Sequence, residues 1–143
     1  LCFNFEVMFI ITLLSRLPFW ALYLISDFLF VISYYVVGYR KKIVRKNLRN
    51  SFPDKSIKEL KRIERQFYRD LCDYGVETVK LLTISKEELM KRMVYKNPEI
   101  TKPFADKGQS IILLTSHQFN WEWLLVSGCF YLPFHVDFVY QRQ

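Results

Sequence analysis

Cysteine and histidine are scarce in this sequence. Its 143 residues contain three cysteines, Cys2, Cys72 and Cys129, and two histidines. The cysteines lie far apart, no Cys-x-x-Cys pair occurs, and the histidines do not cluster with them. We therefore expect neither a disulfide framework nor a zinc site, and we interpret the cysteines as reduced structural thiols.

Acidic residues are also few, with 14 Asp and Glu against 21 Lys and Arg. The excess of positive charge is local, because residues 39–69 hold 12 Lys/Arg and 3 Asp/Glu. A protein that binds nucleic acid over a uniformly basic surface is therefore disfavoured. The hydrophobic content of 51% excludes a disordered chain, and the length suffices for one modest domain with a core.

Charge is nearly absent from residues 1–38, which contain 28 apolar side chains and only Glu6, Arg16 and Asp27 as charged ones. As a helix, residues 17–38 would extend about 33 Å, which is one bilayer core. Aromatic residues near both ends are typical of membrane interfaces. A cleaved signal peptide fits less well, because the run is long and no cleavage site precedes the basic block. We predict a membrane helix, with a buried core helix as the alternative.

A carboxylate interrupts the middle of this run. At a bilayer centre, Asp27 would cost about 2.5–3.5 kcal/mol on insertion scales. Trp20, Tyr23, Asp27 and Tyr34 share one helical face. We therefore expect this face to contact protein, or the helix to lie partly in the membrane interface.

Six cations follow within residues 40–49, including Arg40, Lys41, Lys42 and Arg45. Such a cluster at the end of a membrane helix marks the cytoplasmic side. Each cation near the surface attracts anionic lipid by about 1 kcal/mol. We interpret these four residues as contacts to the membrane surface. A solvated basic helix face is the alternative, and nucleic acid is a weaker one.

Two helices are predicted in the middle of the chain. Phe-Pro-Asp at residues 52–54 ends the basic segment, and Ser56 with Glu59 forms a capping box. Apolar residues at steps of three or four then predict one long amphipathic helix. Ser85 with Glu88 caps a second, shorter helix.

From residue 94 onward the pattern predicts an α/β fold. The continuous apolar run at 110–115 is typical of a buried parallel strand, and the alternation at 135–140 predicts another. A strand, a helix and a second strand in this order indicate a parallel sheet. Along the chain we expect a short strand at 94–95, a helix at 98–107 ended by Gly108, the strand at 110–115, a helix at 119–129 and the strand at 135–140.

His117 directly follows the predicted strand at 110–115, and Glu122 comes five residues later. Open α/β sheets bind ligands beyond the carboxyl ends of their strands. Five helical residues turn about 140°, so the two side chains meet only if His117 lies in the turn before the helix. A neutral imidazole could then deprotonate a hydroxyl, with the carboxylate fixing its tautomer. A histidine that merely caps the helix is the alternative, and His135, which lacks this context, is interpreted as structural.

The sequence SHQFNWEW at 116–123 resembles the His-x4-Asp/Glu motif of the lipid A biosynthesis acyltransferases, the lauroyl/myristoyl transferase family. Their common form is His-Phe/Tyr-Gly-Asn-Trp-Glu. The chain departs from it at Phe119, where the family usually has Gly. Residues 44–53 are similar to the family's Arg-x-x-Asn-Leu-x-x-x-Phe-Pro segment. The resemblance covers essentially the whole chain and looks closest to members from Bacteroidetes-type bacteria.

This resemblance implies a glycerolipid-acyltransferase-like domain in an enzyme of the bacterial inner membrane, acting on the cytoplasmic face. Such enzymes move a fatty acyl chain from acyl carrier protein to a hydroxyl of a lipid A precursor, with no metal, cofactor or covalent acyl-enzyme. His117 would be the general base, Glu122 would orient it, and Asn120 and Trp121 would contact substrate. The alternatives are an acyltransferase acting on a glycerophospholipid or aminolipid, and a non-catalytic, membrane-anchored basic module.

We divide the chain into a membrane anchor at 1–38, a basic and amphipathic helical segment at 39–93, and the first part of the α/β acyltransferase domain at 94–143. The family is about twice as long, and its later Arg-containing motifs have no counterpart here. We therefore expect a C-terminally truncated chain that is inactive alone, with an exposed edge on its incomplete sheet.

Overall fold

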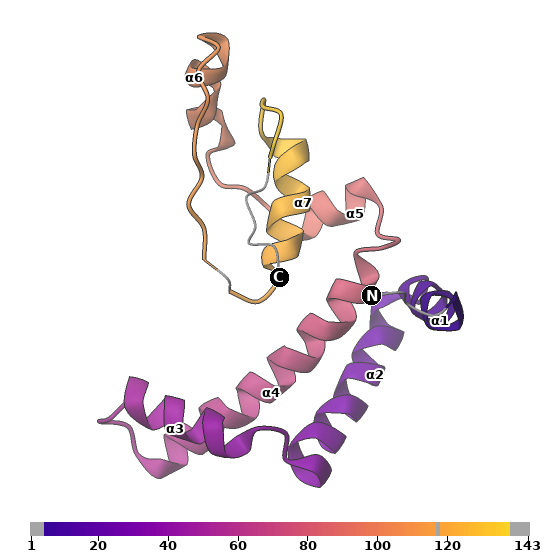
Figure 1. Ribbon diagram of the computed structural model, residues 1–143, viewed down its shortest axis with the longest axis vertical. Helices are drawn as coiled ribbons and strands as arrows, with labels where there is room; N and C mark the ends of the chain where they lie inside the picture. The colour runs from indigo at the N-terminus through magenta and orange to yellow at the C-terminus, as the bar shows by residue number, and fades with distance from the viewer. Residues whose placement is uncertain (1–4, 117, 138–143) are drawn as a thin grey trace. The chain divides into compact units, whose positions relative to one another are not determined.

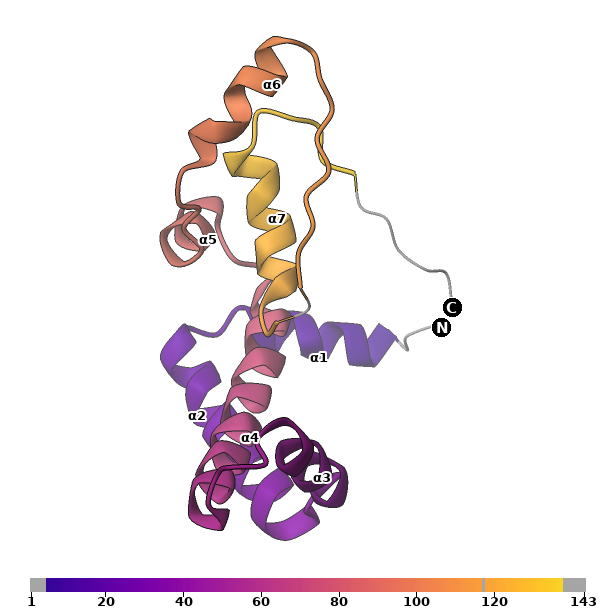
Figure 2. The ribbon, with the colours of Figure 1, turned by 90° about the vertical axis from the view of Figure 1, so that its left-hand side faces the viewer.

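A computed structural model describes residues 5–116 and 118–137, and over these residues the regular elements are helices (Figures 1 and 2). The chain divides into two compact units, Leu1–Thr83 and Ile84–Gln143. The first unit holds α1 (Phe5–Ser15), α2 (Phe19–Val31), the π-helical η1 (Ile32–Val37), α3 (Lys41–Ser51) and α4 (Ile57–Lys80). The second holds α5 (Lys86–Arg92), the 3-10 helix η2 (Pro98–Thr101), α6 (Lys102–Asp106) and α7 (Trp121–Tyr131).

The apolar helix expected at 17–38 is present as α2 continued by η1. Pro18 precedes its first turn in an extended conformation, where its missing N–H is not needed. The helix ends at Gly38, whose φ of 65° lies in the left-handed region that glycine adopts without steric cost. By length and composition, Phe19–Val37 is the one helix in the described part of the chain that could cross a membrane.

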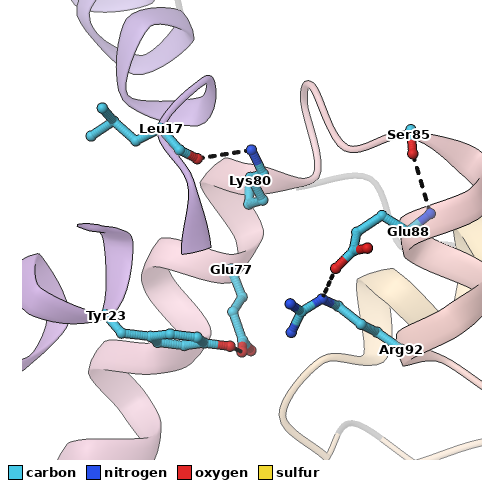
Figure 3. A network of polar contacts seen from close by, with 7 residues as sticks. All are labelled: Leu17, Tyr23, Glu77, Lys80, Ser85, Glu88 and Arg92. Atoms are coloured by element: carbon cyan, nitrogen blue, oxygen red, sulfur yellow. Dashed lines mark hydrogen bonds and ion pairs between the residues drawn. The ribbon is translucent and has the colours of Figure 1, made fainter. Parts of the chain in front are cut away.

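The shared face of Trp20, Tyr23, Asp27 and Tyr34 is divided between two environments. Tyr34 is buried, and Tyr23 donates a hydrogen bond to Glu77 of α4 at 2.6 Å (Figure 3). Trp20 and Asp27 are exposed, so only part of this face contacts protein. The part that does so, Tyr23 and Tyr34, meets α4.

Helix α3 ends and helix α4 begins at the predicted residues. Helix α3 ends at Ser51, immediately before Phe52 and Pro53. The capping box of α4 is complete, because Ser56 Oγ accepts a hydrogen bond from the Glu59 N–H and the Glu59 carboxylate accepts one from the Ser56 N–H. These hydrogen bonds from Ser56 hold the pKa of Glu59 below its ordinary value.

The core of the first unit lies between α2 with η1 and α4, which run side by side in opposite directions (Figures 1 and 2). Phe30, Tyr34 and Tyr68 form its buried centre, and Tyr34 meets the other two rings at centroid distances of 5.6 and 5.3 Å. Burial raises the pKa of Tyr68, whose hydroxyl donates a hydrogen bond to the Tyr39 carbonyl. An aromatic cluster thus joins the end of the apolar helix to α4.

The second unit is built on the contact between α5 and α7. Ser85 caps α5 by accepting a hydrogen bond from the Glu88 N–H at 3.2 Å, as predicted (Figure 3). Tyr131 of α7 donates a hydrogen bond to the Met90 carbonyl of α5 at 2.9 Å. The helix predicted at 98–107 is present as η2 and α6 and ends before Gly108, and the helix predicted at 119–129 is α7.

The predicted α/β fold class is wrong for the described residues, which contain no strand and no sheet. Residues 94–95, 110–115 and 135–137 are irregular, and 138–140 lie outside the described residues. The run at 110–115 is also exposed rather than buried, with Leu114 at 95% exposure. A strand forms only when a neighbouring strand accepts its hydrogen bonds, and in the described residues nothing pairs with this run.

Candidate functional site

The predicted site lies where the irregular segment enters α7. His117 falls outside the described residues, so the structure describes only its neighbours. Before it, Ser116 ends the exposed apolar run, and after it the Gln118 N–H donates a hydrogen bond to the Ser116 carbonyl at 3.0 Å. The Trp121 N–H bonds the Phe119 carbonyl at 2.5 Å. The backbone at Phe119 and Asn120 therefore turns sharply before the helix begins.

Phe119 adopts a conformation that favours glycine. Its φ is 38°, one of three positive values among the described non-glycine residues. For a residue with a Cβ, the left-handed region costs roughly 1–2 kcal/mol. This is the position where the common form of the motif has Gly. The chain thus keeps the turn that Gly would favour and carries an exposed aromatic side chain there at a cost in backbone energy.

Glu122 occupies the first turn of α7, with Asn120 at the N-cap position. Glu122 is half-buried, and the Glu122 Oε2 and Asn120 Oδ1 atoms are removed from solvent. A carboxylate in the first turn of a helix is stabilised by the positive end of the helix dipole. Both polar groups are thus held at the helix start, within the turn that follows His117.

Trp121 and Trp123 flank Glu122 and differ in burial. Trp123 is 3% exposed and is part of the small core beneath α7, whereas Trp121 is half-buried. Of the two residues predicted to contact substrate, Asn120 and Trp121, neither is fully buried, and both stand at the start of α7. Asn120, Trp121 and Glu122 are consecutive in the sequence and lie at the start of α7, and the fourth predicted residue of the motif, His117, lies outside the described residues.

Tyr95 supports the first turns of α7 and was not identified from the sequence as a site residue. Its hydroxyl donates a hydrogen bond to the Leu124 carbonyl at 2.5 Å, and its ring stacks on Tyr131 at 4.9 Å. Burial raises the pKa of Tyr95. The sequence placed Tyr95 in a short strand, and no spacing signal linked it to a helix 26 residues further on.

The four cations predicted to contact the membrane lie in and next to α3. Lys41 Nζ lies 3.9 Å from the centroid of the Tyr34 ring, and Arg45 makes a two-pronged ion pair with Glu64 of α4, at 2.9 and 3.1 Å. That pair raises the pKa of Arg45. Arg40 and Lys42 are exposed. Two of the four cations thus anchor α3 to the rest of the unit.

Residues 2–127 match the family model described as bacterial lipid A biosynthesis acyltransferase. The match includes the whole motif from His117 to Glu122. Comparison with curated proteins and with solved structures gave no significant match. Since the family model covers most of the sequence, the chain belongs to the bacterial lipid A biosynthesis acyltransferase family and is an acyltransferase.

Proposed function

We propose that the protein transfers a fatty acyl chain from acyl carrier protein to a hydroxyl of a lipid A precursor, at the cytoplasmic face of the bacterial inner membrane. The observation that carries the proposal is the motif His117-x4-Glu122, which lies inside the matched residues and ends in the first turn of α7. Family membership by itself does not establish the donor, the catalytic roles or the location, so these belong to the proposal.

The proposed chemistry needs one base. His117 takes the proton from the acceptor hydroxyl, and the resulting alkoxide attacks the thioester carbonyl. A C–O bond forms, the C–S bond breaks, and the thiolate of the carrier recovers the proton from His117. Glu122 keeps the imidazole in the required tautomer and stabilises the imidazolium. Backbone N–H groups at the start of α7 are suitable donors for the oxyanion that develops.

The remaining residues serve binding. Asn120 and Trp121, at the start of α7, contact the substrate. Arg40 and Lys42, exposed next to the apolar helix, attract the anionic lipid surface in which the acceptor resides. Support for membrane attachment comes from the apolar helix Phe19–Val37 and the basic helix α3 that follows it.

The test uses the intact protein, acyl carrier protein loaded with a labelled acyl chain, and a lipid A precursor. His117→Ala should lower the rate by about 10²–10⁴, the usual contribution of a positioned base. The matched control is His135→Ala, because His135 is highly exposed and lies outside the motif. Equal membrane content and equal circular dichroism for both variants establish that folding is preserved.

Near-normal rates for His117→Ala would remove the proposed base. Label appearing in glycerophospholipid or aminolipid, rather than in the lipid A precursor, would contradict the proposed acceptor. A rate that is unchanged when acyl carrier protein is replaced by acyl-coenzyme A would contradict the proposed donor.

The role of Glu122 has its own signature. Glu122→Gln removes the negative charge that stabilises the imidazolium and so lowers the pKa of His117. Because a general base works above its pKa, the acidic limb of the rate profile should move to lower pH while the maximal rate falls. An unshifted acidic limb would show that Glu122 does not act on His117.

A further inference from the structure

Helix α4 covers one side of the apolar helix along its full length. Tyr23 donates a hydrogen bond to Glu77, and Ser26 donates one to Asp73, both at 2.6 Å. At the start of α2, Lys80 donates a hydrogen bond to the Leu17 carbonyl at 2.9 Å (Figure 3).

The contacts continue to the far end of the apolar helix. The Arg69 guanidinium lies 5.1 Å from the centroid of the Phe30 ring. Ser33 of η1 has its Oγ atom 3.6 Å from the Sγ atom of Cys72 in α4. Polar groups of α4 thus meet α2, η1 and the residue before α2 at about every turn from Arg69 to Lys80, and they form one polar seam between the two helices.

The other side of α4 is highly charged and suited to contact with water. The helix carries eleven charged side chains over its 24 residues. Lys58, Lys61, Arg62 and Arg65 are all exposed. A helix with this surface does not enter the hydrocarbon region of a bilayer, because each unpaired charge there is strongly unfavourable.

The uncovered side of α2 is an apolar stripe. Its members recur at steps of three or four residues and are 48–68% exposed: Trp20, Leu24, Phe28, Val31 and Tyr35. Asp27 lies beside this stripe and is itself exposed. In a helix that crossed the membrane, Asp27 would stand near the bilayer centre, whereas in a helix that lies along the surface it reaches the headgroups.

We propose that α2 and η1 lie along the membrane surface within one leaflet, with the apolar stripe among the acyl chains and α4 in the aqueous phase. The occupant of the stripe is a lipid leaflet rather than a second protein. Two observations favour lipid, namely the unbroken apolar composition of the stripe and the basic helix α3 that continues directly from it. A helix across the bilayer would have to separate from α4 or take the charges of α4 with it.

This inference rests on the membrane attachment in the proposed function, but it is tested separately. The intact protein, with its native cysteines replaced by serine, carries a single cysteine at an exposed position on either side of the apolar helix, Arg16→Cys or Ser51→Cys. Sealed membrane vesicles of both orientations are treated with a membrane-impermeant maleimide. We expect both cysteines to react from the same side of the membrane.

Labelling of the two positions from opposite sides would overturn the proposal and leave the membrane attachment intact. Recovery of the protein in the supernatant after a carbonate wash would instead contradict the membrane attachment, and the inference with it. The two failures are therefore distinguishable.

A second measurement asks what covers the stripe. A spin label on Phe28→Cys should collide readily with oxygen and poorly with a water-soluble nickel complex, as expected for a site among acyl chains. Arg65→Cys on the exposed side of α4 is the matched control and should show the reverse. Dipolar broadening between Phe28→Cys labels would indicate a second copy on the stripe and would overturn the lipid assignment.

The pairing itself is tested by a crosslink. Ser33→Cys faces the native Cys72 and should form an intramolecular disulfide in membrane-bound protein under mild oxidation. The same substitution combined with Cys72→Ser is the control that should form none. Failure of the first variant to crosslink in membranes would show that α2 has left α4, which contradicts the in-plane arrangement.

Discussion

The two units both expose large apolar side chains, but in different backbone settings. In the first unit they form a stripe on a regular helix, from Trp20 to Tyr35, next to a basic helix. In the second unit the two most exposed, Ile112 and Leu114 at 88% and 95%, lie on an irregular segment. A helix satisfies its own backbone hydrogen bonds and can face lipid, whereas an irregular segment cannot, because its N–H and C=O groups need polar partners. Exposed apolar side chains thus suit a membrane on the stripe of the first unit but not on this irregular segment.

The units also differ in what holds their helices together. In the first unit, polar side chains of α4 reach α2, α3 and the chain before α2. In the second unit, α7 is connected to its neighbours by hydrogen bonds that tyrosine hydroxyls donate to backbone carbonyls. Tyr95 donates to Leu124, and Tyr131 donates to Met90. Hydrogen bonds that involve a charged side chain favour one specific arrangement of two helices. A neutral hydrogen bond from a hydroxyl to a backbone carbonyl adds only a modest net stabilisation.

Arg45→Leu should produce the largest loss of stability and confine it to the first unit. Glu64 is 2% exposed, and the substitution removes its charged partner, which is itself half-exposed. A buried charged group left without its partner costs about 1–3 kcal/mol. Hydrogen exchange read by mass spectrometry should show faster exchange in α3 and α4 and no change in α7.

Lys46→Leu is the control, because Lys46 is an exposed neighbour on the same helix. Equal effects of the two substitutions would mean that the ion pair contributes nothing beyond surface charge.

Phe119→Gly tests the strained turn of the second unit. Glycine removes the roughly 1–2 kcal/mol cost of a positive φ but adds back about 0.5–1 kcal/mol of chain entropy. We therefore expect slower hydrogen exchange in the first turns of α7, by a modest factor. Phe119→Ala keeps the Cβ and should give no such gain, so equal behaviour of the two variants would contradict the strain.

A pair of helical glycines should show the smallest effects and contrasts the two units directly. Gly75 of α4 has open space around the position of a Cβ, so Gly75→Ala should stabilise the first unit by about 0.5–1 kcal/mol. At Gly128 of α7, an added Cβ would lie 3.0 Å from the Tyr95 hydroxyl. Gly128→Ala should therefore lose most or all of that gain.

Tyr95→Phe combined with Gly128→Ala should recover the gain, because the hydroxyl that crowds the Cβ is removed. Urea unfolding of these three variants and of Tyr95→Phe alone, which is the reference for the lost hydroxyl, measures these differences. Equal stabilisation by the two single alanine variants would show that the contact between Tyr95 and α7 is loose.

Local sequence signals predicted helices well and the sheet not at all. Ser56 with Glu59, the Phe-Pro pair at 52–53 and Gly108 influence only the backbone within a few residues, so their effect is visible in the sequence. The strand predicted at 110–115 required a partner elsewhere in the chain, and apolar composition does not supply one. Tyr95 was missed as a support of α7 for the same reason, since its contact with Leu124 depends on the packing of distant segments.

The sequence alone identified the family, the His117-x4-Glu122 motif, the apolar helix with its basic neighbour, and the caps of α4 and α5. These features depend on residue type and short spacing, which folding does not alter. The tertiary structure was needed to show that α4 covers one side of α2, that Asp27 is exposed and that Phe119 has a positive φ. The first two depend on which distant surfaces meet, because the side chains that stabilise such contacts lie tens of residues apart in the chain, whereas the third is a backbone angle that residue type alone does not give.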